Sequence, residues 1–510
     1  MSSVVWVLIA FVLYAGVMIA IGGFFFKKSN NLSDYFLGGR KLNSWVAAFS
    51  AQASDMSGWL LMGLPGAVYA FGTGQMWIAV GLAIGTALNW LLVAKRLRRY
   101  TIKAGDAITI PQYFENRFHD NTHILRVAAG IFITIFFTVY TASAFVAGGT
   151  LFSQVFGIDY QIALVISVVI ILVYTFLGGF SAVSWTDMVQ GTLMLIAILS
   201  VPLLALAALG GLSGLQSEVS PTFLNALMDE NGQPLTFISV ISQLAWGLGY
   251  FGMPHILVRF MAIRNEKSVT KSAAIAITWV ILSLSFAIFL GVIGAAFTPD
   301  LADPETVFIT MIQKVFMSAN AIVPVPLIGG IFLCGILAAI MSTADSQLLV
   351  TSSSITGDIY RGTINRKASE THYVWFSRAV VVAVALVAYL IAVDRTSSIM
   401  GLVSNAWSGF GSTFGALVLI SLYWKKVTRA AAAAGIISGG VTVILWDYVP
   451  FLRDAQGAAA TLADTTGLYS LVPGFFLSLL FIVLFSLAAK KGTTEKMERQ
   501  FEEVFSGPVD

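Results

Sequence analysis

The sequence predicts an all-α integral membrane protein with about 13 transmembrane helices. The chain has 510 residues, of which 57% are hydrophobic and only 11% are charged, whereas ordinary soluble domains carry about 25% charged residues. Its apolar stretches reach the roughly 20 residues that a helix needs to cross a bilayer. The net charge of +3 is too small to indicate a nucleic-acid partner. The expected partner of this surface is therefore the lipid bilayer.

The expected spans alternate across the membrane. They are residues 4–26, 43–70, 74–95, 124–155, 160–180, 186–210, 236–262, 270–297, 326–356, 373–393, 397–424, 428–449 and 466–489. With the N-terminus outside, 26 of the 29 Lys and Arg residues fall in segments on the inner side. Short cytoplasmic loops are enriched in Lys and Arg, so we expect an outer N-terminus and a cytoplasmic C-terminus.

The second span carries a carboxylate in an apolar run. Asp55 lies between small hydroxyl residues in the stretch Ser54–Gly58. A charge in the middle of a bilayer costs about 2.5–3.5 kcal/mol and usually faces a polar cavity. Unwound backbone is tolerated there only where it lines protein or water, and its carbonyls can then coordinate a cation. The alternative is that Asp55 caps a helix or pairs with a basic residue.

The seventh span contains a second interruption. Gly247, Gly249 and Gly252 match a dinucleotide-binding pattern, but no strand–helix–strand unit surrounds them, so we reject that function. Glycines followed by Pro254 in mid-membrane predict a discontinuous helix. Trp246, Tyr250 and Pro254 would share one helical face, where aromatic side chains either contact a ligand or simply pack.

The two interrupted spans are five spans apart, which predicts two inverted five-helix repeats with binding sites between them. The expected division is 1–42, an extra N-terminal helix and inner loop; 43–210, the first repeat; 211–235, an outer loop; 236–424, the second repeat; 425–489, two extra C-terminal helices; and 490–510, a cytoplasmic tail.

The ninth span supplies a third polar group. Ser342, Thr343 and Asp345 lie deep in an apolar segment. Hard cations prefer oxygen ligands, and neutral hydroxyls suit a weak, reversible site for a monovalent ion. The alternative is that both hydroxyls bond to carbonyls of their own helix.

These segments, in this order, resemble the sodium/solute symporter family, most closely its bacterial proline-transporting members. The resemblance covers nearly the whole chain and rests on five motifs: Asp34–Arg40, Ser54–Trp59, Trp185–Asp187, Gly249–His255 and Ser342–Val350. It implies a LeuT-type fold of five plus five helices in the bacterial inner membrane. It also implies sodium-driven uptake of L-proline by alternating access, without enzyme activity.

The resemblance further implies roles for single residues. Sodium would be held by the carbonyls of Ala53, Met56 and Ala339 and the hydroxyls of Ser342 and Thr343, with Asp55 and Asp187 in support. The substrate would contact Ser57, Gly58, Tyr140, Trp246, Tyr250 and Pro254.

One further hypothesis concerns a second cation site. Asp345, Ser346 and Asp187 are expected to approach one another across the ninth and sixth spans, where they could hold a cation or share a proton, since paired carboxylates raise one pKa. The alternative is that Asp345 pairs with an inner basic residue.

Other functions stay open. A related substrate, such as betaine or pantothenate, would use the same architecture. A cation channel would explain the spans but not the paired interruptions with aromatic residues. A transporter-like sensor would need an output domain. The histidines form no catalytic pattern, and His119 and His123 are interpreted as surface residues rather than metal ligands. Nothing in this mechanism requires an oligomer.

Overall fold

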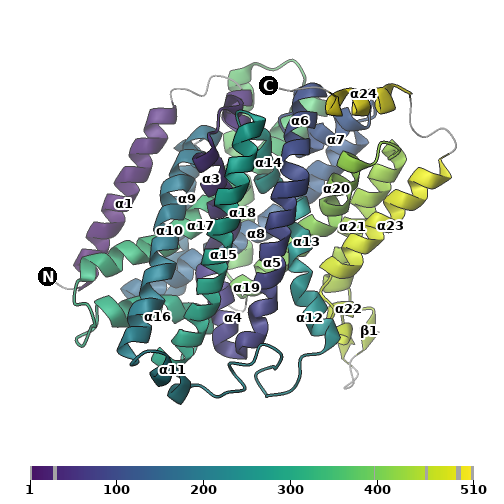
Figure 1. Ribbon diagram of the computed structural model, residues 1–510. Coiled ribbons are helices and arrows are strands. Elements are labelled where there is room, and N and C mark those ends of the chain that lie inside the picture. The colour runs from purple at the N-terminus through teal and green to yellow at the C-terminus, as the bar shows by residue number, and fades with distance from the viewer. Residues whose placement is uncertain are drawn as a thin grey trace.

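Figure 1 shows a computed structural model of the chain as a bundle of long helices. The structure describes residues 3–26, 32–177, 179–394, 397–453, 458–489 and 495–506. The helices of the first half are α1 (Ser3–Phe26), α2 (Leu32–Leu37), α3 (Ser44–Gly58), α4 (Leu64–Phe71), α5 (Met76–Leu88), α6 (Lys95–Lys103), α7 (Ile110–Arg117), α8 (Ile124–Phe156), α9 (Tyr160–Leu177), α10 (Phe180–Ala208) and α11 (Leu212–Glu218).

The second half continues the bundle. Its helices are α12 (Phe237–Leu244), α13 (Trp246–Gly249), α14 (Pro254–Ala262), α15 (Glu266–Phe297), α16 (Val307–Phe316), α17 (Pro326–Ser353), α18 (Glu370–Ala392), α19 (Ile399–Phe410), α20 (Ala416–Tyr423), α21 (Arg429–Tyr448), α22 (Leu462–Thr466), α23 (Leu471–Ala488) and α24 (Glu495–Phe505). Strands β1 (Leu452–Arg453) and β2 (Ala459–Ala460) form one small antiparallel pair. Several helices are joined end to end by π-helical segments, η2 (Trp59–Gly63), η4 (Asn89–Ala94), η7 (Ser354–Ile364) and η8 (Gly411–Gly415), or by 3₁₀ helices, η5 (Tyr250–Gly252) and η6 (Pro304–Thr306).

Ten helices of the described chain are long and apolar enough to cross a membrane. The other three predicted spans correspond to shorter or interrupted helices: α9, the α3–α4 segment and the α12–α14 segment. The chain is thus a multi-pass membrane protein, as its composition predicts.

The centre of the bundle is formed by α17 and α3. In α17, 83% of the most apolar window is buried, against 28% in the peripheral α1. Helix α3 packs against α10, α15 and α17. Because most residues of α3 and α17 are buried against other helices, polar side chains on them can meet protein partners instead of lipid tails.

The first interruption is at Ser57. Its φ of 52° and ψ of −171° break the helical path inside α3, a conformation that costs a non-glycine residue about 1–3 kcal/mol. The Ser57 hydroxyl accepts a hydrogen bond from the backbone N–H of Trp59 at 3.0 Å. Serine is a favoured N-cap because its oxygen satisfies a free amide of the first turn, so the helix restarts at once.

The second interruption is at Met253. This residue is extended, with φ −79° and ψ 104°, and Pro254 occupies the first turn of α14. Proline disfavours helical conformation in the residue before it and fits the first helical turn. The two interrupted segments run in opposite directions: α3 and α14 lie near one end of the bundle, and α4 and α12 near the other (Figure 1).

The same end of the bundle carries α6, α7 and the C-terminal helix α24 (Figure 1). Helix α24 is docked there by Lys425, whose ammonium lies 2.7 Å from the Glu502 carboxylate and 3.6 Å from that of Glu498. The opposite end carries α11, α16 and the β1–β2 pair (Figure 1).

Candidate functional site

Four of the five expected sodium ligands lie together where α17 crosses α3. The Ser342 hydroxyl donates to the carbonyl of Ala53 at 2.8 Å and to that of Ala339 at 3.2 Å. The Thr343 hydroxyl lies 3.4 Å from the Ala53 carbonyl. The fifth, the Met56 carbonyl, lies at the interruption and accepts the N–H of Trp59. The arrangement gathers neutral oxygens, the ligand type that a hard cation prefers.

The Asp55 carboxylate points to the second interrupted segment. Its Oδ2 accepts a hydrogen bond from the Tyr250 hydroxyl at 2.7 Å, and the side chain of Asp55 is buried. The backbone carbonyl of Asp55 accepts from the Tyr140 hydroxyl at 3.2 Å. No basic side chain is among these partners, so the pairing alternative does not hold within the described contacts. Asp55 instead connects the two interruptions to each other.

An aromatic pocket adjoins this contact. Its lining residues come from α3, η2, α5, α8, α13, η5 and α19: Asp55, Met56, Trp59, Leu82, Tyr140, Trp246, Tyr250, Val403 and Trp407. The Trp246 ring stacks on Trp59 at 5.4 Å and on Trp407 at 6.3 Å between centroids. The enclosed volume is about 10 Å³, about the space of a single water-sized probe. Side chains must therefore move before the pocket can hold a larger molecule.

Three residues expected to contact substrate are not among the pocket's lining residues. A Cβ at Gly58 would lie 2.9 Å from Cβ of Ala147, so this glycine allows α3 to approach α8 closely. Ser57 caps the following turn, and Pro254 starts α14. These residues shape the interruptions that carry the pocket walls.

Trp59, Trp407, Leu82 and Val403 line the pocket without having been singled out from the sequence as substrate contacts. Trp407 donates from its indole Nε1 to the carbonyl of Trp246 at 2.7 Å. The available signal was a tryptophan among small residues in the stretch 404–412. Its register relative to α13 could not be read from sequence.

A buried cluster of charged residues lies about one helical turn from Ala53 along α3, toward the end of the bundle that carries α24. Asp187 Oδ2 accepts from the Ser50 hydroxyl at 2.6 Å and from Arg259 Nη2 at 3.2 Å. Arg259 Nη2 also donates to the Ser346 hydroxyl at 2.6 Å. The cluster therefore joins α3, α10, α14 and α17.

The side chain of Arg259, a residue of α14, is fully buried. Besides Asp187 and Ser346, it contacts the Ser50 hydroxyl and the His255 carbonyl, at 3.1 and 2.9 Å. Packing against α10 and α17 places this charge inside the bundle, where a carboxylate compensates for its lost hydration.

Asp345 is adjacent to this cluster but is not joined to the guanidinium by a described ion pair. Its Oδ1 accepts from the Ser346 hydroxyl at 3.3 Å. Its Oδ2 and the Oδ1 of Asp187 are buried and have no hydrogen-bond partner in the described part of the chain. Two carboxylates thus share the surroundings of one guanidinium.

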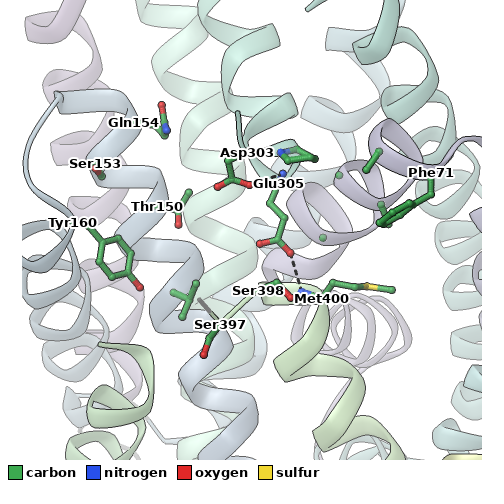
Figure 2. Close-up of a pocket in the computed structure, with 16 residues that line it drawn as sticks. Phe71, Thr150, Ser153, Gln154, Tyr160, Asp303, Glu305, Ser397, Ser398 and Met400 are labelled. Atoms are coloured by element: carbon green, nitrogen blue, oxygen red, sulfur yellow. Dashed lines mark hydrogen bonds between the residues drawn. The ribbon is translucent and has the colours of Figure 1, made fainter. Parts of the chain in front are cut away.

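A larger cavity of about 640 Å³ lies at the end of the bundle opposite α24, between α4, α8, η6 and the start of α19. Figure 2 shows Glu305 at its wall, pointing to Met400. The Glu305 carboxylate accepts the backbone N–H groups of Ile399 and Met400, at 3.0 and 2.9 Å. Burial raises the pKa of Glu305, while these two amides favour its ionised form.

Met400 separates this cavity from the aromatic pocket. Its Sδ lies 2.8 Å from the Trp59 indole Nε1, and Met400 lines the large cavity while Trp59 lines the pocket. The Trp59–Met400 contact therefore forms the partition between the two spaces.

Comparison with known families decides what kind of protein carries this site. The sodium:solute symporter family matches residues 35–439. The chain belongs to the sodium:solute symporter family. A member of this family is a transporter and not an enzyme, and sodium is its coupling ion.

Individual relatives agree with the family. The chain is 45% identical over 488 residues to sodium/proline symporters of Staphylococcus aureus strains JH9 and N315, covering 94% of this chain and 92% of each relative. It shares its fold with a substrate-bound, outward-open Na⁺-coupled sialic acid symporter (TM-score 0.75, 17% identity, 96% of this chain and 99% of that chain). A second neighbour is MHP1, a nucleobase-cation-symport-1 family transporter in a closed conformation (TM-score 0.53, 14% identity, 93% and 99%).

Proposed function

We propose that this protein couples inward sodium flow to the uptake of L-proline by alternating access. The observation that carries the proposal is the junction of the two interrupted helices, where Asp55 meets Tyr250 at 2.7 Å. Candidate sodium oxygens lie on one side of this junction and an aromatic pocket on the other. The named function of relatives that are 45% identical over 94% of the chain supports proline as the substrate.

The proposed arrangement in the membrane has 13 spans, an outer N-terminus and a cytoplasmic C-terminus. Residues 43–210 and 236–424 form the two inverted repeats of a LeuT-type core, with one extra helix before it and two after it. The opposite directions of the interrupted segments (Figure 1) support this inversion. Bacterial relatives support location in the inner membrane, and transport by this core does not require an oligomer.

In the proposed sodium site, Ala53, Met56 and Ala339 supply carbonyl oxygens, and Ser342 and Thr343 supply hydroxyl oxygens. The 2.8 Å contact between Ser342 and Ala53 supports it, because bound sodium would bridge oxygens that already lie together. Sodium would thereby hold the unwound turn of α3 against α17. Asp55 and Asp187 are not among the proposed ligands. They support the site through the hydrogen bonds that they accept from Tyr250 and Ser50.

In the proposed substrate site, Tyr140, Trp246 and Tyr250 enclose the pyrrolidine ring. Ser57, Gly58 and Pro254 contribute through the backbone geometry of the two interruptions. Since the pocket measures only about 10 Å³ in the present conformation, entry requires the Trp59–Met400 partition to open. The cavity of about 640 Å³ beyond Met400 is the proposed approach from outside.

Coupling follows from the shared segment. Sodium and proline both bind to the turn around Ala53–Ser57, so each stabilises the geometry that the other needs, and the coupling is reciprocal. A sodium ion moving inward down a membrane potential gains about 2.3 kcal/mol per 100 mV. This energy drives the uphill entry of a zwitterion.

We further propose that Asp345, Ser346 and Asp187 take up a second cation or a proton. Support comes from the two buried carboxylate oxygens without a described partner. One guanidinium, that of Arg259, neutralises only one of the two carboxylates. A bound cation or a proton would neutralise the other carboxylate.

The test of function is uptake of labelled proline by the purified protein in sealed liposomes with an imposed sodium gradient. We expect accumulation above the external concentration, abolished by collapsing the gradient. Competition by unlabelled proline and not by betaine or pantothenate would distinguish proline from the alternative substrates. Sodium current that is independent of any solute would instead indicate a channel, and solute binding without transport would indicate a sensor.

A further inference from the structure

A crevice of about 520 Å³ opens at the end of the bundle that carries α24, away from the sodium and proline sites. It lies between the first turn of α3, the N-terminal part of α10 and the start of α15. Three basic side chains line it, Arg264, Lys267 and Lys271, and no carboxylate of the part of the chain that the structure describes does. The crevice therefore presents an unbalanced positive charge.

Glu266, the acidic residue beside Lys267 in the sequence, forms its ion pairs with another helix. Glu266 forms ion pairs with Lys95 and Arg99 of α6, each at 2.9 Å, and it does not line the crevice. Within the described residues, no carboxylate forms an ion pair with Arg264, Lys267 or Lys271. Arg264 donates from Nε to the Ser268 hydroxyl at 3.2 Å, which holds its guanidinium near the mouth of the crevice.

Two tryptophans flank these charges. Trp45 is 50% exposed and Trp185 is 40% exposed, and both line the crevice. Tryptophan is enriched where membrane meets water, because its ring is amphipathic. An exposed indole pair beside basic residues is the arrangement expected at the level of lipid headgroups.

We propose that this crevice binds the phosphate-bearing headgroup of an anionic phospholipid. Basic pockets between transmembrane helices on the cytoplasmic side bind such headgroups, and the proposed orientation puts this end of the bundle in the cytoplasmic leaflet. The hydroxyl of Ser44 already donates to the Ser268 carbonyl at 3.2 Å, so the headgroup would sit where α3 meets α15. The bound headgroup would thus hold the first turn of α3 against the start of α15.

The experiment uses the full chain purified in detergent and native mass spectrometry with added phosphatidylglycerol. Phosphatidylcholine with the same acyl chains is the zwitterionic comparison. We expect one phosphatidylglycerol to bind preferentially. The double variant Lys267→Gln, Lys271→Gln should lose about thirtyfold in affinity, since each basic residue near an anionic lipid contributes a factor of about five.

The matched control is Lys367→Gln, Lys426→Gln. It removes two exposed lysines that do not line the crevice, and its lipid affinity should be unchanged. An equal loss in both double variants, or equal binding of both lipids, would overturn the proposal. Calorimetry with inorganic phosphate distinguishes the sources of the anion, because phosphate binding as tight as that of the lipid would also overturn it. Sodium-driven uptake is measured separately, so failure here and failure of the transport function are distinguishable.

Discussion

The Tyr250 hydroxyl donates a hydrogen bond of 2.7 Å to the Asp55 carboxylate, joining two interrupted helices that are 195 residues apart in the chain. Tyr250 also packs edge-on against Trp407 at 5.1 Å between ring centroids. One residue thus contacts both the segment proposed to bind sodium and the wall of the aromatic pocket. In the proposed mechanism, this bond would link sodium binding to the geometry of the pocket.

Asp55→Asn and Tyr250→Phe should affect proline affinity non-additively. Asp55→Asn removes the charge of the acceptor and Tyr250→Phe removes the donor, so each single variant loses the charge assistance and the double variant loses it only once. We expect a coupling energy of about 1.5–3 kcal/mol, the range for hydrogen bonds to charged groups, from a double-mutant cycle on proline binding. Additive single effects would show that the contact does not contribute to binding.

Ser342→Ala and Thr343→Ala should each raise the half-saturating sodium concentration by roughly tenfold, which corresponds to about 1.4 kcal/mol. The cause is loss of one candidate oxygen ligand. Ser353→Ala is the control, because its hydroxyl donates to the Val350 carbonyl of the same helix at 2.8 Å and to no other residue that the structure describes. The measurement is initial uptake rate against sodium concentration. Equal shifts in all three variants would argue against a sodium site at Ser342.

Trp246→Ala should weaken proline affinity by about tenfold or more with little change in sodium selectivity. The indole stacks on Trp59 and forms one wall of the pocket, and burial of a ring contributes about 1.5–3 kcal/mol. Trp375→Ala is the control, since this tryptophan is 57% exposed and distant in sequence from the pocket walls. Unaltered proline affinity in Trp246→Ala would dismiss the pocket.

Asp345→Ala should reduce the Hill slope of sodium-dependent uptake if the second cation is sodium. If the group instead takes up a proton, the slope stays at one and the pH dependence of uptake changes. Both effects follow from the buried carboxylate oxygen that lacks a described partner. A Hill slope and a pH profile that are both the same in the variant as in the parent would count against any cation role for Asp345.

Glu305→Gln should loosen the partition between the large cavity and the pocket, because the amide cannot accept both N–H groups of α19. With Cys334, the single cysteine, replaced by alanine, a cysteine introduced at Val403 reports access to the pocket. We expect about tenfold faster thiol modification, corresponding to loss of one charged hydrogen bond. Glu218→Gln, an exposed site at the same end, is the control.

The pH dependence of that labelling has a defined sign. Burial raises the pKa of Glu305, so its carboxylate is protonated at a higher pH than that of an exposed glutamate. The thiolate is the reactive form of cysteine, so each labelling rate is divided by that of Glu305→Gln at the same pH. This ratio should rise as pH falls through the raised pKa of Glu305. A ratio that does not change with pH would show that Glu305 does not hold the partition closed.

Local chemistry made both helix interruptions predictable. Ser57 caps the turn that follows it, and Pro254 forces Met253 out of the helix. Both effects act within a few residues, so they can be read directly from the printed sequence. The same holds for the membrane helices, since hydropathy depends on composition over about 20 residues. The hydroxyls of Ser342 and Thr343 could be proposed as ligands because polar residues inside an apolar span are visible in the sequence itself.

The partners of the buried charges were decided by packing alone. Arg259 lies in an apolar stretch near the end of α14, and local sequence cannot distinguish a loop cation from one that reaches Asp187, 72 residues away. Likewise, Trp407 reaches the carbonyl of Trp246 across 161 residues. Sequence by itself determined where the helices form and break. The tertiary structure decided which side chains meet, because crossing positions and rotations of packed helices depend on every contact in the bundle.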